Sequence, residues 1–413
     1  MWRKIFFSLL AGCWLAEWSS AHTTSNDTDI QILTNAVSVF SYDLYRRIGV
    51  KAVNVIYSPL SAHTVLSLAY MGAKGNTEHQ MKNVLRLKDL PSPHEAFHAL
   101  LHNITEVQDV EVLVANGMWL NPKLKLRPEY QRQVSTLYNA ASETIDFKSL
   151  GGPERPINEW IANQTKNQIT SFMLPSTISQ DIQMILINTL FFNGTWESPF
   201  DEYLTHKNSF QLSLGNKIDI DFMRQTATYQ VKMSAVENVD VIRMPFTNER
   251  FAFYIALPKS YSGLRDFEMM IVLQDYERIN GLFTDMKTER VDLMLPKFKI
   301  TTSLNLNRGL KNLGMTDAFG QLANFHGISE NQLFLSEVIQ KATIEVTEKG
   351  TLADAASAVT LSNRLGLLRK PLKFNVDHPF MFFLRDDLNG LILFQGKFTN
   401  PTVKESSEDR RRK

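Results

Sequence analysis

The chain has a single cysteine, Cys13, among its 413 residues. An intramolecular disulfide needs two cysteines and a thiolate zinc site needs more, so both are excluded. Cys13 also lies in an N-terminal segment with the pattern of a removable signal, so we expect the mature chain to lack any thiol nucleophile. Without cross-links the fold must depend on a large core, which 44% hydrophobic residues can supply.

Long apolar runs are absent beyond the N-terminus. Residues 1–21 combine the basic Arg3 and Lys4, an apolar run from Ile5 to Ala16, and small residues at the end. This pattern is typical of a secretory signal peptide, and it is too short to span a membrane. No other stretch approaches the ~18 apolar residues that a transmembrane helix needs. We therefore expect a secreted, extracellular protein with no membrane anchor.

An excess of charge of either sign is also absent. Removing residues 1–21 takes Arg3, Lys4 and Glu17 from 44 basic and 43 acidic residues, which leaves 42 of each. A neutral chain creates no global field that would select nucleic acid or a membrane surface. Four Asn-x-Ser/Thr sequons agree with secretion and predict glycosylation; they begin at Asn26, Asn103, Asn163 and Asn193.

The motifs of common enzyme classes are missing. There is no G-x-S-x-G, H-E-x-x-H, G-x-G-x-x-G or Walker sequence. His94, His98 and His102 recur every four residues, which predicts three imidazoles on one helix face. A metal or anion site there is one interpretation. The ordinary alternative, a solvated or partly packed face, is favoured because no acidic partner has ligand spacing. We expect no enzyme activity, metal or cofactor.

No repeat or Pro/Gly/Ser-rich linker divides the chain, so residues 22–413 are expected to form one domain. Helical patterns dominate the first half and strand patterns follow residue 180, which predicts the α+β class. The polar tail, 402–413, is expected to be a frayed terminus. Helices are expected over roughly 30–47, 60–72, 76–87, 94–103 and 155–172. Strands are expected at Val112 to Leu120, Met184 to Phe192, Tyr229 to Met233, Val239 to Pro245, Phe251 to Leu257, Val291 to Ile300, Lys341 to Thr347, Leu372 to Asn375, Phe380 to Arg385 and Gly390 to Phe398.

One long stretch, EVTEKGTLADAASAVTLSNRLGLLRKPLKFNVDHPF at 345–380, contains too few large apolar groups to build a core. Its middle is rich in small side chains, which bury little area where they stand. A loop of this length is usually functional or disordered. The small side chains are Ala353, Ala355, Ala356, Ser357 and Ala358.

Five segments in order resemble the serpin superfamily, over about residues 30–401. They are NVIYSPLSAHTVLSLAYMGAKGNTEHQM (54–81), INTLFFNGTWESPFDEYLTHKNSF (187–210), LPKFKI (295–300), IEVTEKGT (344–351) and DHPFMFF with LILFQGKFTNP (377–401). The resemblance implies a monomer with a large central β-sheet, further sheets, about eight or nine helices and an exposed reactive loop at about 349–372. A protease cleaves such a loop, and the freed segment inserts into the central sheet as a new strand.

The family spacing places the scissile bond between Arg364 and Leu365, fourteen residues after the hinge glycine, Gly350. Arginine at this position matches trypsin-like serine proteases, whose primary pocket holds a carboxylate. Arg369 and Lys370 are alternative cleavage sites. Cleavage there would release five or six extra residues and should give a looser trap.

Strand alternation is consistent with insertion of this loop. Counting in twos from Thr351 to Val359 places only small or modest side chains on the face that would be buried. Leu352 and Asp354 depart from the usual family pattern, but both would point to the other face. The resemblance assigns the loop hinge to Glu348, Gly350, Thr351, Ala353, Ala355 and Ala356.

The resemblance also implies two polar sites that control opening of the sheet. The breach, at the top of the insertion gap, corresponds to Trp196, Lys297 and Glu348, with an expected Lys297–Glu348 ion pair. The shutter lies further down. Its glutamine stands where many serpins have histidine, and it can still donate and accept hydrogen bonds. The shutter residues are Ser58, Ser61, Asn188 and Gln340.

The leading functional hypothesis is a secreted suicide-substrate inhibitor that traps a trypsin-like serine protease in a covalent complex. The alternative is a non-inhibitory serpin that acts as a carrier, storage protein or chaperone. Bulky, charged or proline residues on the buried hinge face would favour the alternative, and this sequence has none there. Glycosaminoglycan control, common in the family, has little support because residues 94–103 contain no Lys or Arg.

Overall fold

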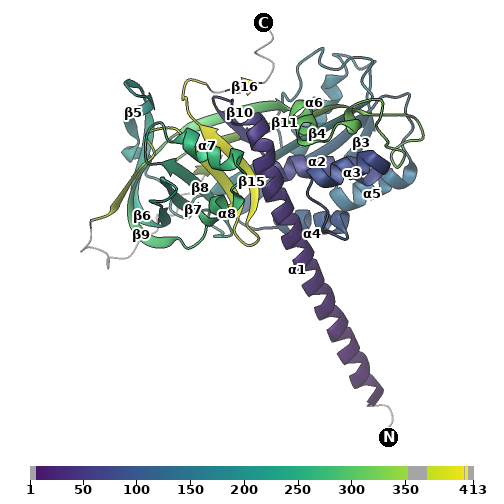
Figure 1. Ribbon diagram of the computed structural model, residues 1–413, viewed down its shortest axis with the longest axis horizontal. Helices are drawn as coiled ribbons and strands as arrows, with labels where there is room; N and C mark the ends of the chain where they lie inside the picture. Colours follow the sequence, from purple (N-terminus) through teal and green to yellow (C-terminus); the bar gives the residue numbers. More distant parts are fainter. Residues whose placement is uncertain (1–5, 352–369, 404, 408–413) are drawn as a thin grey trace.

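The computed structural model describes residues 6–351, 370–403 and 405–407, and its architecture confirms the α+β class (Figure 1). The described residues form nine α-helices and two short 3-10 helices around two sheets. The helices are α1 (Phe6–Ile48), α2 (Pro59–Gly72), α3 (Gly75–Val84), α4 (Pro93–Thr105), α5 (Pro128–Tyr138), α6 (Glu154–Gln164), α7 (Leu264–Val272), α8 (Tyr276–Gly281) and α9 (Asn307–Leu313), with the 3-10 helices η1 (Glu202–Leu204) and η2 (Asp317–Phe319).

The larger sheet has nine strands and forms one side of the molecule in Figure 1. Its order is β1 (Val55–Tyr57), β15 (Leu391–Phe398), β14 (Phe380–Asp386), β8 (Phe251–Pro258), β7 (Val239–Pro245), β6 (Asn216–Met233), β9 (Lys287–Pro296) and β13 (Leu372–Asn375), and β5 (His206–Ser213) pairs with β6. The seven-stranded sheet, called the central sheet below, has the order β16 (Glu405–Ser407), β10 (Phe298–Asn305), β11 (Leu335–Val346), β12 (Gly350–Thr351), β4 (Met184–Thr195), β2 (Val110–Leu120) and β3 (Ala141–Thr144).

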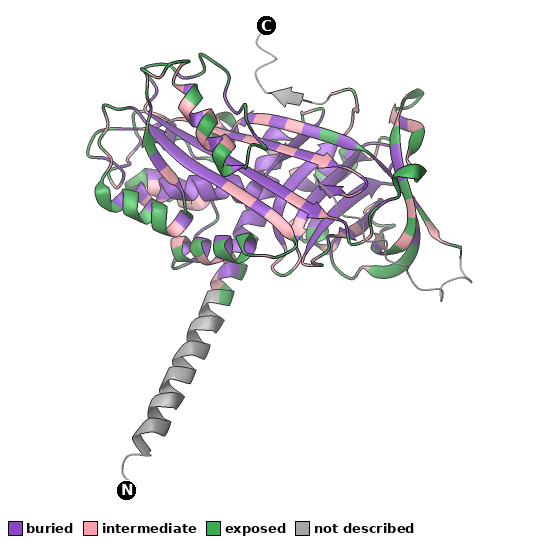
Figure 2. Ribbon diagram, turned by 180° about the vertical axis from the view of Figure 1, so that it is seen from behind, coloured by how far each residue is buried: buried purple, intermediate pink, exposed green. Residues whose placement is uncertain are grey.

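The central sheet is covered on both faces over part of its length. One face packs into the main core, which includes the almost entirely buried helix α2. The opposite face, called the front face below, carries a second, smaller apolar cluster, which includes Ile185 and Ile187 of β4 and Ile157 and Ile161 of α6. Strand β4 is therefore buried on both sides. Figure 2 colours much of the interior of the molecule as buried. A strand covered in this way needs apolar residues at successive positions, and MILINTLFF supplies them.

Strands β4 and β11 are joined along only part of their length. They pair in parallel from Met184 with Leu335 to Thr189 with Lys341. Beyond that point, residues 190–193 of β4 and 342–345 of β11 do not pair with each other, as far as the described residues show. The short strand β12 enters at the far end of this opening, between the two strands.

Several predicted boundaries needed correction. The helix expected over 30–47 is part of a longer one, α1, which begins at Phe6. The helix expected over 155–172 ends at Gln164, because Lys166 and Asn167 adopt positive φ values of 49° and 63°. The strand expected from Val291 to Ile300 is two strands that meet at Lys297. Helices α5, α7, α8 and α9 were not predicted. Among the described residues, no helix is both long and apolar enough to cross a bilayer.

Candidate functional site

The hinge preceding the loop is held by residues 196–205, which we call the hinge clasp. Its backbone bonds directly to the hinge: the Trp196 amide donates to the Lys349 carbonyl at 2.9 Å, and the Phe200 amide donates to the Glu348 carbonyl at 2.8 Å. Each bond satisfies a group that would otherwise be left unpaired where the chain leaves the sheet. The clasp thus fixes the positions of Glu348 and Lys349.

Trp196 anchors the clasp in the core. Its side chain is buried and stacks on Phe246, with ring centroids 4.7 Å apart. The indole Nε1–H donates to the Thr347 carbonyl at 2.9 Å. A buried tryptophan usually needs a partner for this donor, and here the partner belongs to the hinge. Trp196 therefore joins the hinge to the aromatic core.

Glu348 forms the polar half of the breach. Lys297 Nζ lies 2.8 Å from its Oε2, which is the ion pair expected from the sequence, and Thr205 Oγ1 donates to its Oε1 at 2.7 Å. The Glu348 side chain is only 7% exposed. Burial alone would raise its pKa, but the hydrogen bonds from Lys297 and Thr205 outweigh burial and hold the pKa below its ordinary value of 4.5. The carboxylate therefore stays charged at neutral pH.

Gly350 brings two backbones into close contact. Its φ is +155°, and a Cβ at this position would lie 1.9 Å from the carbonyl oxygen of Gly194. Only glycine allows β12 to pair with β4 in this way. The next residue, Thr351, is 1% exposed, and its Oγ1 has no hydrogen-bond partner among the described residues. The first side chain of the alternating series is thus already inside the sheet.

The predicted shutter residues converge where β4 and β11 pair. Gln340 Nε2 donates to the Ser58 carbonyl at 2.8 Å and to Asn188 Oδ1 at 3.0 Å, and its Oε1 accepts from the Ser58 amide at 3.0 Å. Ser61 Oγ donates to the same Asn188 oxygen. The glutamine therefore donates and accepts, as expected. Asn188 Nδ2 donates to Asn116 Oδ1, a member that we did not predict. The sequence signal for this contact is a lone asparagine within the otherwise apolar strand VLVANGMWL.

This network locks the two strands together. Asn188 and Gln340 are register partners, one step before the last direct pair of β4 with β11. Both side chains are buried, so parting the strands would leave their polar groups unpaired unless a new strand replaced the lost contacts. Separation of β4 from β11 starting at the β12 end would therefore have to break the Gln340–Asn188 contact.

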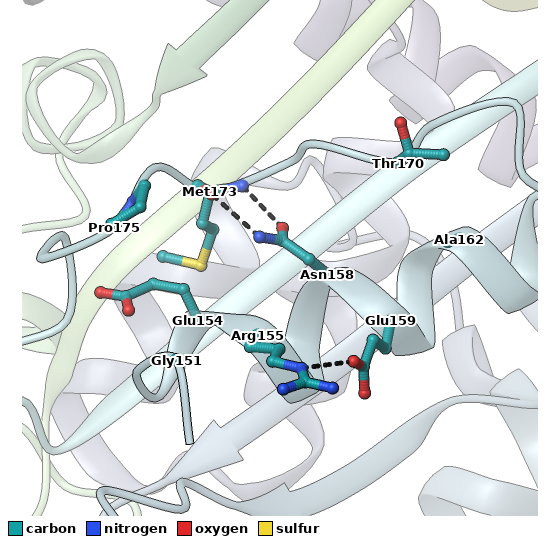
Figure 3. Close-up of a pocket in the computed structure, with 9 residues that line it drawn as sticks. All are labelled: Gly151, Glu154, Arg155, Asn158, Glu159, Ala162, Thr170, Met173 and Pro175. Carbon is teal, nitrogen blue, oxygen red and sulfur yellow. Dashed lines mark hydrogen bonds and ion pairs between the residues drawn. The ribbon is translucent and has the colours of Figure 1, made fainter. Parts of the chain in front are cut away.

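The front of the paired region is covered by α6 and the segment after it. Asn158 fastens the two together, because its Oδ1 accepts from the Phe172 and Met173 amides at 3.0 and 2.9 Å and its Nδ2 donates to the Met173 carbonyl at 2.9 Å (Figure 3). A pocket of about 330 Å³ lies between helix and segment. It is lined by Gly151, Glu154, Arg155, Asn158, Glu159, Ala162, Thr170, Met173 and Pro175.

The three histidines lie at every fourth position of α4 but do not share one environment, which agrees with the favoured interpretation of a partly packed face. His94 turns inward, with Nδ1 2.6 Å from the Tyr138 hydroxyl, and its burial lowers the pKa to about 4. His98 and His102 are exposed, and His102 Nδ1 lies 3.5 Å from Glu106. Within the described residues, no group of three His, Cys, Asp or Glu is arranged to hold a metal. His94 therefore stays neutral at pH 6.

The remaining predicted sites are only partly within the structure. Asn103 and Asn163 are exposed, and Asn193 is half-exposed on β4. The side chain of Asn26 lies outside the described part, and Lys370 is exposed where the chain resumes. The residues of the loop itself lie outside the described residues: Arg364, Leu365, Arg369, Ala353, Ala355 and Ala356.

The contact between Gly350 and Gly194 predicts that Gly350→Ala expels β12 from the sheet. A clash costing more than ~1.4 kcal/mol shifts the equilibrium at least tenfold toward the open hinge. Amide hydrogen exchange should quicken by about that factor at Thr347, which donates to the Gly350 carbonyl at 2.9 Å, and at Trp196, which donates to the Lys349 carbonyl at 2.9 Å. Gly281→Ala is the control, since a Cβ there meets nothing within 4 Å. Unchanged exchange at both amides in Gly350→Ala would contradict the assignment.

The lowered pKa of Glu348 predicts a pH-dependent hinge. Because the folded pKa lies below 4.5, the stabilisation is present above that pH and is lost as pH falls through the folded pKa. At pH 7 Glu348→Gln should lower the free energy of unfolding by about 1 kcal/mol, and this difference should shrink on acidification. Denaturant midpoints measured from pH 7 to pH 3 test it. A difference that stays constant across the series would rule the ion pair out as its origin.

Comparison with known proteins agrees with this geometry. A family model described as Serpin (serine protease inhibitor) matches residues 35–401. The leukocyte elastase inhibitor of Xenopus tropicalis is 32% identical over 380 residues, which cover 89% of this chain and 99% of that protein.

Solved structures share the fold over nearly the same length. Serpin48 of the insect Tenebrio molitor superimposes with a TM-score of 0.80 at 28% identity, covering 90% of this chain and 98% of that one. Human thyroxine-binding globulin gives 0.82 at 25% identity, covering 90% and 99%. The match of the family model along almost the whole chain, together with these relatives, shows that the protein belongs to the serpin family.

Proposed function

We propose that this protein is a secreted suicide-substrate inhibitor of a trypsin-like serine protease. The observation that carries the proposal is the position of Thr351, which lies buried between β4 and β11 at the open end of the central sheet. A loop whose first residue is already paired can continue into the gap without a new nucleation step. The small residues that follow in the sequence suit burial in a packed sheet.

The chemistry would begin as ordinary proteolysis. The protease serine attacks the carbonyl carbon of Arg364, the bond to the Leu365 nitrogen breaks, and an ester between Arg364 and the protease remains. The freed segment then extends β12 between β4 and β11. Fourteen residues at ~3.3 Å each span roughly 45 Å, so the attached protease would be carried along the sheet. Hydrolysis of the ester needs precise geometry, and its loss leaves the protease trapped.

The polar lock decides how readily this happens. Insertion must break the Gln340–Asn188 contact and part the six pairs that join β4 and β11. In the inserted product, the entering backbone would satisfy the hydrogen-bonding groups of both strand edges. The free-energy cost of breaking the existing contacts therefore raises the transition state for insertion more than it destabilises the product. We therefore assign the shutter residues to the rate of trapping, and the breach residues Trp196, Lys297 and Glu348 to the entry of the loop.

The carrier hypothesis remains the alternative, since human thyroxine-binding globulin has a similar fold. Hinge composition favours inhibition, because no bulky, charged or proline residue lies at the positions alternating with Thr351. An enzyme is not favoured, because the sequence contains none of the common catalytic motifs. We further infer that residues 1–21 are removed on export, that residues 22–413 form a single monomeric domain, and that the sequons at Asn26, Asn103, Asn163 and Asn193 receive glycans.

Arg364→Ala should abolish the denaturant-resistant complex with trypsin, because the primary pocket then has no cation to pair with its carboxylate. Denaturing gels of the mature protein mixed with trypsin measure it. Arg369→Ala is the matched control and should leave the complex in place. The opposite pattern, in which only Arg369→Ala removes the complex, would move the scissile bond.

Thr351→Arg should convert the inhibitor into a substrate. The side chain at 351 is buried in the sheet, and an arginine there cannot lose its charge, so insertion would be impeded at its first step. Leu352→Arg should be nearly harmless, since strand alternation turns that side chain the other way. The measurement is moles of inhibitor consumed per mole of protease inactivated. Equal values for the two variants would show that the assumed alternation is wrong.

A further inference from the structure

Tyr203 differs from the other tyrosines of the chain. The sequence has eleven, all within the described residues. Tyr203 is 97% exposed, Tyr261 is 50% exposed, and the other nine are buried or partly buried. A tyrosine ring usually contributes 150–250 Å² of buried area, roughly, and only its hydroxyl reaches water. Full exposure of the ring therefore contributes nothing to folding and makes the phenol available to another protein.

A tight turn holds the phenol outward. Tyr203 is the middle residue of the 3-10 helix η1, which Asp201 caps by accepting the Tyr203 amide at 2.9 Å. Both ends of the turn are fixed: Phe200 is buried on one side, and Thr205 is bonded to Glu348 on the other. The segment is thus a defined projection at the edge of the hinge clasp.

The turn carries negative charge next to the phenol. Asp201 and Glu202 directly precede Tyr203, and both are exposed. The Glu202 side chain is 66% exposed and forms a long ion pair with Lys349, at 3.9 Å. Residues 196–205 contain three acidic residues and no lysine or arginine. The acidic turn around Tyr203 therefore has the charge and shape to fit a cationic site of another protein that accepts a single projecting phenol.

We propose that Tyr203 is a site of tyrosine O-sulfation, which the protein acquires as it is exported; the inference rests on the proposed secretion. The donor is an activated sulfate, in which sulfate is joined to a nucleotide phosphate as a mixed anhydride. The Tyr203 Oη attacks sulfur, the new O–S bond forms as the sulfur–oxygen bond to the phosphate breaks, and the phenolic proton passes to a base of the transferase. The nucleotide leaves with its phosphate.

Charge complementarity explains the choice of residue. A transferase that binds a polyanionic donor needs a cationic active site, and Asp201 and Glu202 supply the matching charge beside the acceptor. Tyr261 lacks this setting, since the two residues before it are Lys259 and Ser260 rather than two acidic residues. The ester would add a permanent negative charge two residues from Thr205, at the edge of the segment that holds the hinge.

The test uses the full chain secreted by cultured mammalian cells, as wild type, Tyr203→Phe and Tyr261→Phe. After enzymatic removal of N-glycans, peptide mass spectrometry should find the mass of one SO₃ group on the peptide containing Tyr203 in wild type and in Tyr261→Phe. Tyr203→Phe, which alters an exposed side chain and should fold normally, should lack it. The added mass should resist alkaline phosphatase and should disappear when chlorate blocks synthesis of the sulfate donor.

Four results would overturn the proposal: an unmodified Tyr203 in the secreted wild type, added mass that persists in Tyr203→Phe, removal of the mass by phosphatase, or failure of the chain to be secreted. Trypsin complexes are measured on the same preparations. Complexes without sulfate would refute only the modification, whereas sulfate without complexes would refute only the inhibitor function.

Discussion

The structure depends on one constraint: β4 and β11 are bonded directly to each other along only part of their length. Up to Thr189 and Lys341 they are neighbours in a parallel pair, and beyond that point they diverge. The buried Gln340–Asn188 contact lies immediately before the divergence. Two strands that separate within a sheet expose backbone groups which only another strand can satisfy, so the sheet is incomplete by construction.

The hinge lies at the open end of this sheet, where β12 pairs with both β4 and β11. Gly350 and Gly194 allow two backbones to approach at the open end, and Thr351 is buried there with a hydroxyl that has no hydrogen-bond partner among the described residues. Trp196 of the clasp restrains the same segment, and so does the Glu348–Lys297 ion pair. The start of β12 is thus both paired within the sheet and restrained by neighbouring contacts, while α6 covers the closed part of the sheet.

Much of this could be predicted from the sequence because the signals were local or shared with a family. The strand from Val239 to Pro245 was predicted to the residue, and the Lys297–Glu348 pair followed from the resemblance. The inward turn of His94 depends on Tyr138, a residue 44 positions away, and no local pattern contains that information. The role of Asn116 likewise required knowing which residue of β4 it faces. Such contacts are decided by register, which sequence periodicity does not determine.

The central claim is that the intact fold is a kinetically trapped state whose central sheet lacks a strand. Thermal unfolding of intact protein and of protein nicked within 352–369 tests it most directly. The account predicts that the nicked form melts at a much higher temperature, since the released segment completes the sheet, and that Thr351→Arg loses most of this gain. Equal melting temperatures for the intact and nicked wild-type protein would contradict the account.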